Sequence, residues 1–88
     1  MNLSEIIDLW ADKLPDHIAL AYEDERITYL ELLRSINKLS NALVKAGVQK
    51  GDRVVTLMGN RPEFVVSYFA VIRIGAIAVT LNPLSTAY

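Results

Sequence analysis

The sequence predicts an α/β fold made of a helix, a β-hairpin and a second helix, followed by a parallel strand–helix–strand unit. Two observations indicate it. Apolar residues at helical spacing alternate with short β-branched runs, and residues 51–85 place one helical segment between two such runs. Parallel strands joined by a helix belong to sheets that are covered on both faces. A chain of 88 residues can hardly supply both covers, so we expect it to be the beginning of a larger α/β protein.

A first helix and a hairpin are predicted in the first 28 residues. The helix extends over Leu3–Lys13, and Pro15 prevents its continuation. Ile18–Tyr22 and Arg26–Thr28 are the two predicted strands of the hairpin, and a polar turn at 23–25 joins them. One apolar stripe is expected to pack the helix against the core, made of Leu3, Ile6, Ile7, Trp10 and Leu14.

A second helix is predicted from Tyr29 to Ala46, and Gly47 supplies the left-handed residue that commonly ends a helix. Its expected core positions are Leu32, Leu33, Ile36, Leu39 and Leu43. Three helix starts share a capping pattern in which Asn or Thr is followed three residues later by Glu. The three pairs are Asn2 with Glu5, Thr28 with Glu31, and Asn60 with Glu63.

The parallel unit is predicted in the second half of the chain. Arg53–Met58 and Ala76–Leu81 are its two strands, and the helix between them extends from Arg61 to Ile74. Gly75 ends this helix, and Asn82-Pro83 closes the second strand. Apolar residues occupy most of the circumference of the helix, so we expect it to be buried on several sides.

Composition excludes several classes of partner. The net charge of −1 is spread evenly, and without a basic face we expect neither nucleic acid nor an anionic membrane as a partner. No cysteine is present, which excludes disulfides and thiolate metal sites. The apolar run Phe64–Leu81 contains Arg73, whose insertion into a bilayer would cost about 2.5–3.5 kcal/mol, so no transmembrane segment is expected. The first residues lack the pattern of a signal peptide, and we expect a cytoplasmic location.

Few residues are candidates for chemistry. His17 is the only histidine, and its place after a turn predicts a loop residue rather than a catalytic base. Residues 59–61 lie where a parallel strand ends and a helix begins, the usual ligand side of such sheets, where free N–H groups and Arg61 could attract an anion. We favour the simpler interpretation, in which Asn60 caps the helix and Arg61 is solvated. The sequence therefore predicts no catalytic, cofactor-binding or metal-binding residue.

Five phrases of the sequence resemble those of one enzyme family in their order and spacing. They are RITYLEL at 26–32, LVKAGVQKGDRV at 43–54, NRPEF at 60–64, GAIAV at 75–79 and LNP at 81–83. The family is that of the AMP-forming adenylate-forming enzymes, which include acyl-CoA synthetases, luciferases and the adenylation domains of peptide synthetases. By this resemblance, residues 1–88 are identified as one segment, a fragment of the larger N-terminal, AMP-binding domain of such an enzyme.

The resemblance implies a parent enzyme that acts as an ATP-dependent acyl-CoA synthetase, with fatty acid metabolism as its expected setting. In such enzymes a carboxylate attacks the α-phosphate of ATP, pyrophosphate leaves, and coenzyme A takes the acyl group from the adenylate. ATP, Mg²⁺ and coenzyme A are the cofactors implied for the parent. The family's phosphate loop, its ribose-binding Asp and its mobile Lys lie downstream of the matched part. The segment alone is therefore expected to be inactive and to bind none of these cofactors.

Two interpretations stay open. The chain is either the N-terminal portion of an acyl-CoA synthetase or a small α/β binding or regulatory module of the same architecture without catalysis. In the first case, its expected partner is the remainder of the parent chain. When the segment is isolated, its unpaired strand edges and uncovered apolar surface favour a homo-oligomer.

Overall fold

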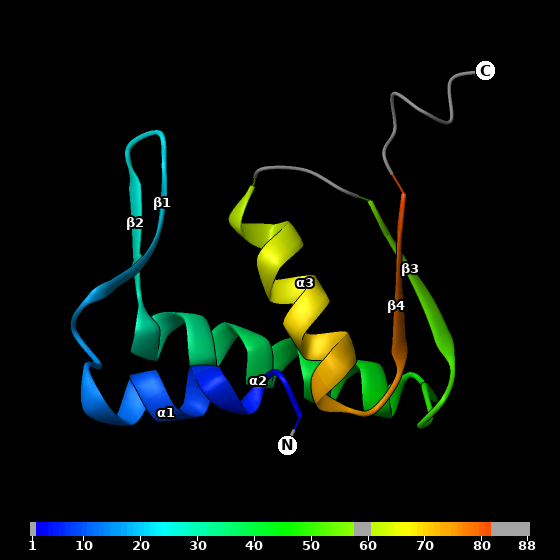
Figure 1. The fold of residues 1–88 in the computed structure, drawn as a ribbon. Coiled ribbons are helices and arrows are strands. Elements are labelled where there is room, and N and C mark those ends of the chain that lie inside the picture. The colour runs from blue at the N-terminus through cyan, green and yellow to red at the C-terminus, as the bar shows by residue number, and fades with distance from the viewer. Residues whose placement is uncertain (1, 58–60, 82–88) are drawn as a thin grey trace.

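The computed structural model describes residues 2–57 and 61–81 and contains the elements in the order that the sequence predicts (Figure 1). These elements are α1 (Glu5–Lys13), β1 (Ile18–Tyr22), β2 (Glu25–Thr28), α2 (Tyr29–Lys45), β3 (Arg53–Leu57), α3 (Pro62–Arg73) and β4 (Ile77–Leu81). Where a predicted end differs from the structure, it differs by one or two residues, as element ends commonly do. The predicted ends at Met58 and at Asn82-Pro83 lie outside the described residues. The α/β class, with a hairpin before a parallel strand–helix–strand unit, is confirmed.

Glycine ends both α2 and α3, as predicted. Gly47 has a φ of 99° and Gly75 a φ of 79°, in the left-handed region that favours glycine. The backbone N–H of Val48 donates to the carbonyl of Leu43 at 3.1 Å, and the equivalent bond after Gly75 measures 3.2 Å. These bonds are those of the Schellman motif, which satisfies carbonyls that a helix end otherwise leaves free.

The predicted capping box at the start of α2 is confirmed. Thr28 Oγ1 accepts from the backbone N–H of Glu31 at 3.1 Å, and the Glu31 carboxylate accepts from the backbone N–H of Thr28 at 2.9 Å. The pKa of Glu31 lies below its ordinary value of 4.5, mainly because the Thr28 backbone N–H donates to the ionised form. The charged carboxylate is therefore part of the cap.

Replacing Glu31 with glutamine should lower the free energy of unfolding at neutral pH. The contribution of this cap to stability should then no longer depend on the ionisation of residue 31. Because the folded-state pKa of Glu31 lies below the unfolded-state value, its contribution is complete above the ordinary value near 4.5 and is lost as pH falls through the folded-state pKa. Urea unfolding of both proteins between pH 7 and pH 3 checks this. The difference in free energy of unfolding between the two proteins should shrink toward acid. A difference independent of pH would contradict the role of the charge.

The predicted cap of α1 is confirmed only in part, because the Asn2 side chain accepts from a free backbone N–H but Asn2 is not the N-cap residue. The helix begins one residue after Ser4, which occupies the N-cap without a side-chain hydrogen bond to the helix. Asn2 uses its side chain differently, because Oδ1 accepts from the backbone N–H of Ser4 at 2.9 Å while Nδ2 donates to the carbonyl of Ile72 at 2.6 Å. Asn2 therefore ties the start of α1 to the last turn of α3, a contact that local sequence does not encode.

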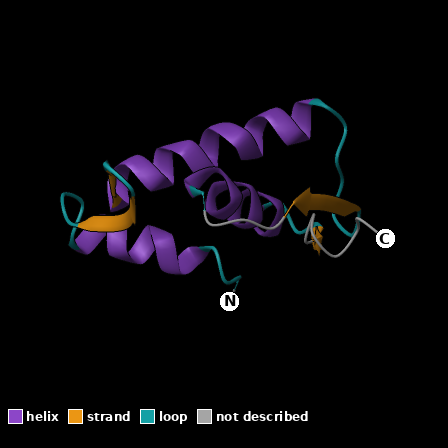
Figure 2. Ribbon diagram, turned by 90° about the horizontal axis from the view of Figure 1, so that it is seen from above, coloured by secondary structure: helices purple, strands orange, loops and turns teal. Residues whose placement is uncertain are grey.

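The core lies where α2 meets α1 and α3, and the four residues Ile7, Leu32, Ile36 and Ala70 form its buried centre. The other predicted core residues of α2, Leu33, Leu39 and Leu43, are partly buried against it. Ser40 is also buried, and its hydroxyl donates to the carbonyl oxygens of Ile36 at 2.8 Å and Ala70 at 3.3 Å. Seen from above, α3 lies between the hairpin and the β3–β4 pair (Figure 2).

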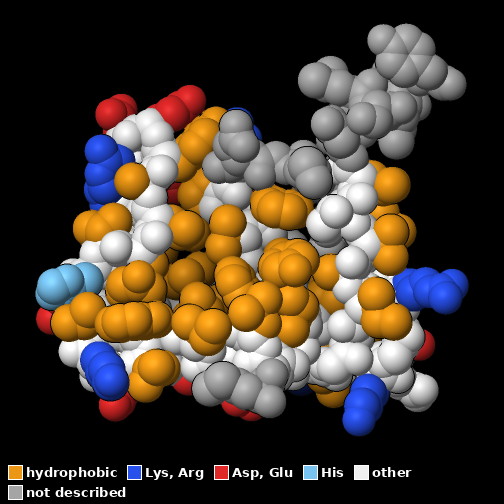
Figure 3. Space-filling model, viewed as in Figure 1, with side chains coloured by type: hydrophobic (Ala, Val, Ile, Leu, Met, Phe, Trp, Pro, Cys, Tyr) orange, Lys and Arg blue, Asp and Glu red, His pale blue; other side chains and the backbone are white. Residues whose placement is uncertain are grey.

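The apolar stripe predicted for α1 is only partly buried. Of its residues, Ile7 is buried and Leu14 half-buried, whereas Leu3, Ile6 and Trp10 are exposed. Ala11, which was not predicted, is also buried. The helix packs chiefly against α2. This contact covers only part of the apolar stripe and leaves the rest at the surface. Figure 3 shows apolar side chains gathered over α1 and the neighbouring part of α3.

The parallel pair β3–β4 is covered by helix on one face only. Arg53 lies opposite Ile77 in the register, and α3 contacts both strands. Because side chains alternate between the faces of a strand, Thr56 is buried while its neighbour Val55 is 59% exposed. Ile77 and Leu81 of β4 are exposed as well, at 50% and 38%. Within the described residues, the face of this sheet away from α3 is therefore mainly apolar and uncovered, with the exposed Arg53 at one end of it.

Helix α3 is less enclosed than its sequence predicts. Only Pro62, Ala70 and Val71 are buried, and its other apolar residues are half-buried. The described part of the chain covers the sides of α3 that face α2 and the strands and leaves the remainder open.

Candidate functional site

The region around the N-terminus of α3 is the best-defined candidate site. Gly59 and Asn60, which the sequence singled out, lie outside the described residues. Arg61 occupies the N-cap of α3, and its side chain makes no capping hydrogen bond. Its guanidinium lies 5.8 Å from the centre of the Tyr22 ring on β1, in cation–π geometry. Arg61 is exposed, as predicted, and its contact with Tyr22 also connects the start of α3 to the hairpin.

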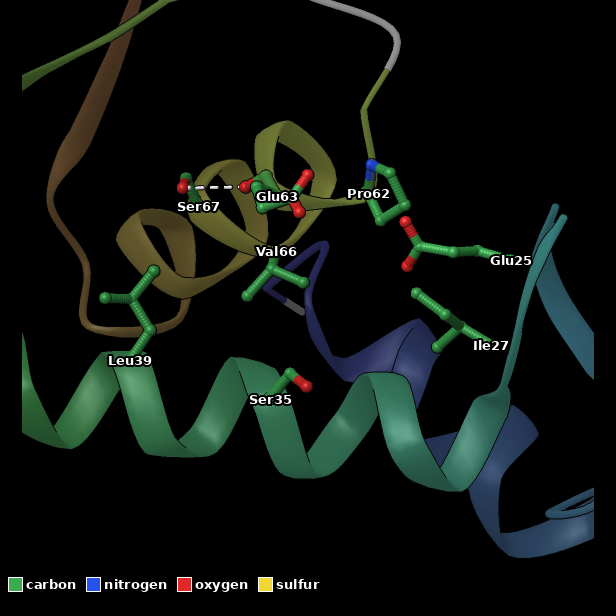
Figure 4. Close-up of a pocket in the computed structure, with 8 residues that line it drawn as sticks. All are labelled: Glu25, Ile27, Ser35, Leu39, Pro62, Glu63, Val66 and Ser67. Atoms are coloured by element: carbon green, nitrogen blue, oxygen red, sulfur yellow. Dashed lines mark hydrogen bonds between the residues drawn. The ribbon is translucent and has the colours of Figure 1, made fainter. Parts of the chain in front are cut away.

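Two cavities flank the first half of α3. One, of about 520 Å³, lies between α3, β3 and α2 and includes Thr56, Arg61 and Phe64 in its lining. The hydroxyl of Thr56 is buried and has no hydrogen-bond partner among the described residues. The other, of about 300 Å³, lies between the hairpin, α2 and α3 (Figure 4). Glu25 and Glu63 are among its lining residues.

His17 lies in the connection between α1 and β1, as predicted. Its side chain is exposed, and its backbone carbonyl accepts from the N–H of Tyr29 at 3.0 Å. Over residues 2–57 and 61–81, no three His, Cys, Asp or Glu side chains are grouped so that they could hold a metal ion. His17 therefore helps to place the start of α2 through its backbone.

One polar cluster was missed by the sequence analysis. The Arg73 guanidinium at the end of α3 forms an ion pair with both carboxylate oxygens of Asp8 on α1, and its Nε donates to Oδ1 of Asn37 on α2 at 2.9 Å. The side chain of Arg73 is 19% exposed, so the charge requires such partners. The signal was present in the sequence, since Arg73 is the only charge in a long apolar run. The cluster joins three helices and has a structural role.

In the described part of the chain, no helix is both long enough and apolar enough to cross a bilayer. The apolar run that contains Arg73 is divided between α3 and β4.

Comparison with known proteins decides the family. Residues 7–88 match the family model described as AMP-binding enzyme. The chain belongs to this family. Acetyl-coenzyme A synthetase 1 of Candida albicans is 45% identical to this chain over 76 residues, which are 80% of the chain and 11% of the synthetase. A long-chain-fatty-acid–CoA ligase of Bacillus subtilis is 36% identical over 87 residues, which are 99% of the chain and 16% of the ligase.

The chain also shares its fold with solved structures of the family. The N-terminal subdomain of NpsA from Klebsiella oxytoca superimposes with a TM-score of 0.87 at 31% sequence identity, over 92% of this chain and 21% of that one. The chain therefore spans about a fifth of that subdomain and less than a fifth of the two curated relatives. The resemblance that the sequence phrases indicated is confirmed, and the 88 residues correspond to a fragment of a larger domain.

Proposed function

We propose that residues 1–88 form the N-terminal portion of an ATP-dependent acyl-CoA synthetase, which converts a carboxylic acid, ATP and coenzyme A into acyl-CoA, AMP and pyrophosphate. The family match over residues 7–88 is the observation that carries the proposal. The two curated relatives are named as an acetyl-CoA synthetase and a long-chain-fatty-acid–CoA ligase, so they share a reaction class and differ in the acid. The proposal accordingly commits to acid–CoA ligation, with fatty acid metabolism as its setting.

The proposed contribution of this segment is architectural. Parallel sheets are stable when both faces are covered, and Val55, Ile77 and Leu81 leave one face of the β3–β4 pair apolar and exposed. In the parent, this face would pack against later parts of the same polypeptide. The remainder of the parent chain is therefore the proposed partner. A cytoplasmic location and self-association of the isolated segment stay predictions.

The described residues do not fit the cofactors that the family implies. No group of His, Asp or Glu side chains among them could bind Mg²⁺, and the guanidinium of Arg61 lies over Tyr22. No step of the reaction is therefore derived from this chain. The proposal assigns ATP, Mg²⁺ and coenzyme A to the remainder of the parent, and it assigns no catalytic, cofactor-binding or metal-binding residue to residues 1–88.

The isolated chain should show no exchange of pyrophosphate into ATP with any carboxylic acid, because the described residues offer no site for a metal-bound triphosphate. The measurement follows labelled pyrophosphate entering ATP with acetate or a long-chain fatty acid as the acid. A matched reaction without protein gives the background. Exchange above this background, abolished by a substitution within residues 1–88, would overturn the proposal that the segment is inactive alone.

A binding or regulatory module without catalysis is the second candidate function. The cavity of about 300 Å³ between the hairpin, α2 and α3 favours it, since its volume lies at the lower end of the range of roughly 300–1,000 Å³ that is typical of ligand pockets. The reading frame beyond Tyr88 separates the two candidates. A Ser/Thr/Gly-rich loop ending in Pro-Lys-Gly some way downstream supports the synthetase, and a stop codon directly after Tyr88 supports the module.

A further inference from the structure

One edge of β3 has no neighbouring strand within the described residues. There β3 pairs with β4 alone, so only one side of the strand is hydrogen-bonded. The backbone carbonyl of Asp52, just before β3, accepts from the N–H of Ile77 at 2.7 Å and therefore points toward β4. Because backbone groups alternate in direction along a strand, Arg53 and Val55 point their N–H and C=O groups away from β4. This row of unused donors and acceptors is a template for a further strand.

A groove lies beside this open edge. It is the cavity of about 520 Å³, whose described lining residues belong to α2, α3 and β3, and none of them belongs to β4. Leu39 and Leu43 line it from α2, and Val54 lines it from β3. In the described part of the chain, α2 packs on α3 but makes no extensive contact with β3, so the groove stays open between them. A strand paired with β3 would place alternate side chains in this groove.

The polar residues of the groove also indicate a missing neighbour. Thr56 lines it and is only 9% exposed, and its hydroxyl has no hydrogen-bond partner among the described residues. A buried hydroxyl of this kind is uncommon in a complete structure, because leaving it unsatisfied costs about 1–3 kcal/mol. The charged lining residues, Arg61 and Glu63, are exposed and of opposite sign. The groove therefore has no net charge that would select a free ion.

We propose that a β-strand from the remainder of the parent polypeptide pairs with the open edge of β3 and fills this groove. The inference rests on the proposed function, since it requires a parent chain. Length favours this occupant, because the matched parts are only 11% and 16% of the two curated relatives. A sheet of two strands is marginal by itself and is stabilised by a third. A strand of the same polypeptide is tethered nearby, whereas a second copy would lose translational freedom on binding.

The test is backbone hydrogen exchange at single residues, measured in the isolated chain and in a chimera. The chimera carries residues 1–88 in place of the matching part of the Bacillus subtilis long-chain-fatty-acid–CoA ligase. In the isolated chain, the amide of Val55 should exchange near the rate of an unstructured peptide, because its N–H lies on the open edge. In the chimera it should exchange at least about 100-fold more slowly, because a paired strand must open before exchange occurs.

Thr56 is the internal control for this measurement. Its N–H points toward β4, so its amide should be protected in both proteins. The isolated chain is measured at low and at high protein concentration. Protection of Val55 that rises with concentration would assign the edge to a second copy and overturn the proposal. Protection of Val55 in the isolated chain at every concentration would overturn it as well, because the edge would then be occupied without the parent.

Activity of the same chimera separates this proposal from the proposed function. Fast exchange of Val55 in a chimera that forms acyl-CoA would overturn the added strand and leave the proposed function intact. Slow exchange of Val55 in a chimera that forms no acyl-CoA would support the added strand and contradict the proposed function. Slow exchange together with acyl-CoA formation is the result that we expect.

Discussion

Replacing Ile36 with alanine should lower the free energy of unfolding by about 2–5 kcal/mol. Ile36 is 0% exposed and lies in the core cluster that joins α2 to α1 and α3. The truncation removes buried methyl and methylene groups and leaves a cavity that packed helices fill only in part. Small domains have stabilities that begin near 5 kcal/mol, so the variant should be largely unfolded at moderate urea concentrations.

The matched control is Val44→Ala on the same helix, since Val44 is 56% exposed. A substitution at such a surface position should change the free energy of unfolding by no more than about 0.5 kcal/mol. Urea unfolding followed by far-UV circular dichroism measures both variants under identical conditions. If Ile36→Ala costs no more than Val44→Ala, the core does not lie where α2 meets α1 and α3.

Features that depend on neighbouring residues could be predicted from the sequence. The capping box of Thr28 and Glu31 and the left-handed Gly47 are set within a few residues of each other, and local preference is enough to place them. The parallel unit could be predicted for a similar reason, because two β-branched runs around a capped helix have few other arrangements.

Contacts between distant segments could not be predicted in this way. The lone charge of Arg73 indicated that a partner was needed, but Asp8 lies 65 residues away and its position depends on how α1 and α3 both pack on α2. The same holds for Asn2, whose side chain also donates to the carbonyl of Ile72 at a separation of 70 residues. Burial of α1 was overestimated because an apolar stripe shows what can be covered, not how much neighbouring helix is present to cover it.

In the candidate site, too, local features could be predicted and contacts between distant segments could not. The sequence indicated the start of α3 as the place to examine, since a strand ends and a helix begins there. It did not predict that Arg61 lies over Tyr22 or that Glu25 and Glu63 share one cavity. Both arrangements depend on where the hairpin stands relative to α3, which packing on α2 determines.

When residues 1–88 replace the matching part of a related ligase, acyl-CoA formation should be retained, and when that part is only removed, it should be lost. A chimera that carries residues 1–88 in place of the matching part of the Bacillus subtilis long-chain-fatty-acid–CoA ligase should form acyl-CoA, because the segment is proposed to supply architecture rather than chemistry. The same ligase without the matching part should form none, since the sheet that it completes would lose two strands and the helix α3.

The sheet face can be tested within that chimera. Val55→Asp places a charge on the apolar face of β3, which later parts of the parent are proposed to cover, and should abolish acyl-CoA formation. Asn41→Asp adds the same charge at an exposed position of α2 and should leave turnover unchanged.

The most direct measurement is acyl-CoA formation by the chimera from palmitate, ATP and coenzyme A, compared with the truncated ligase under the same conditions. The account predicts thioester formation by the chimera and its Asn41→Asp variant, and none by the truncated ligase or the Val55→Asp variant. A soluble chimera that is no more active than the truncated ligase would contradict the account, and so would a Val55→Asp chimera with full activity.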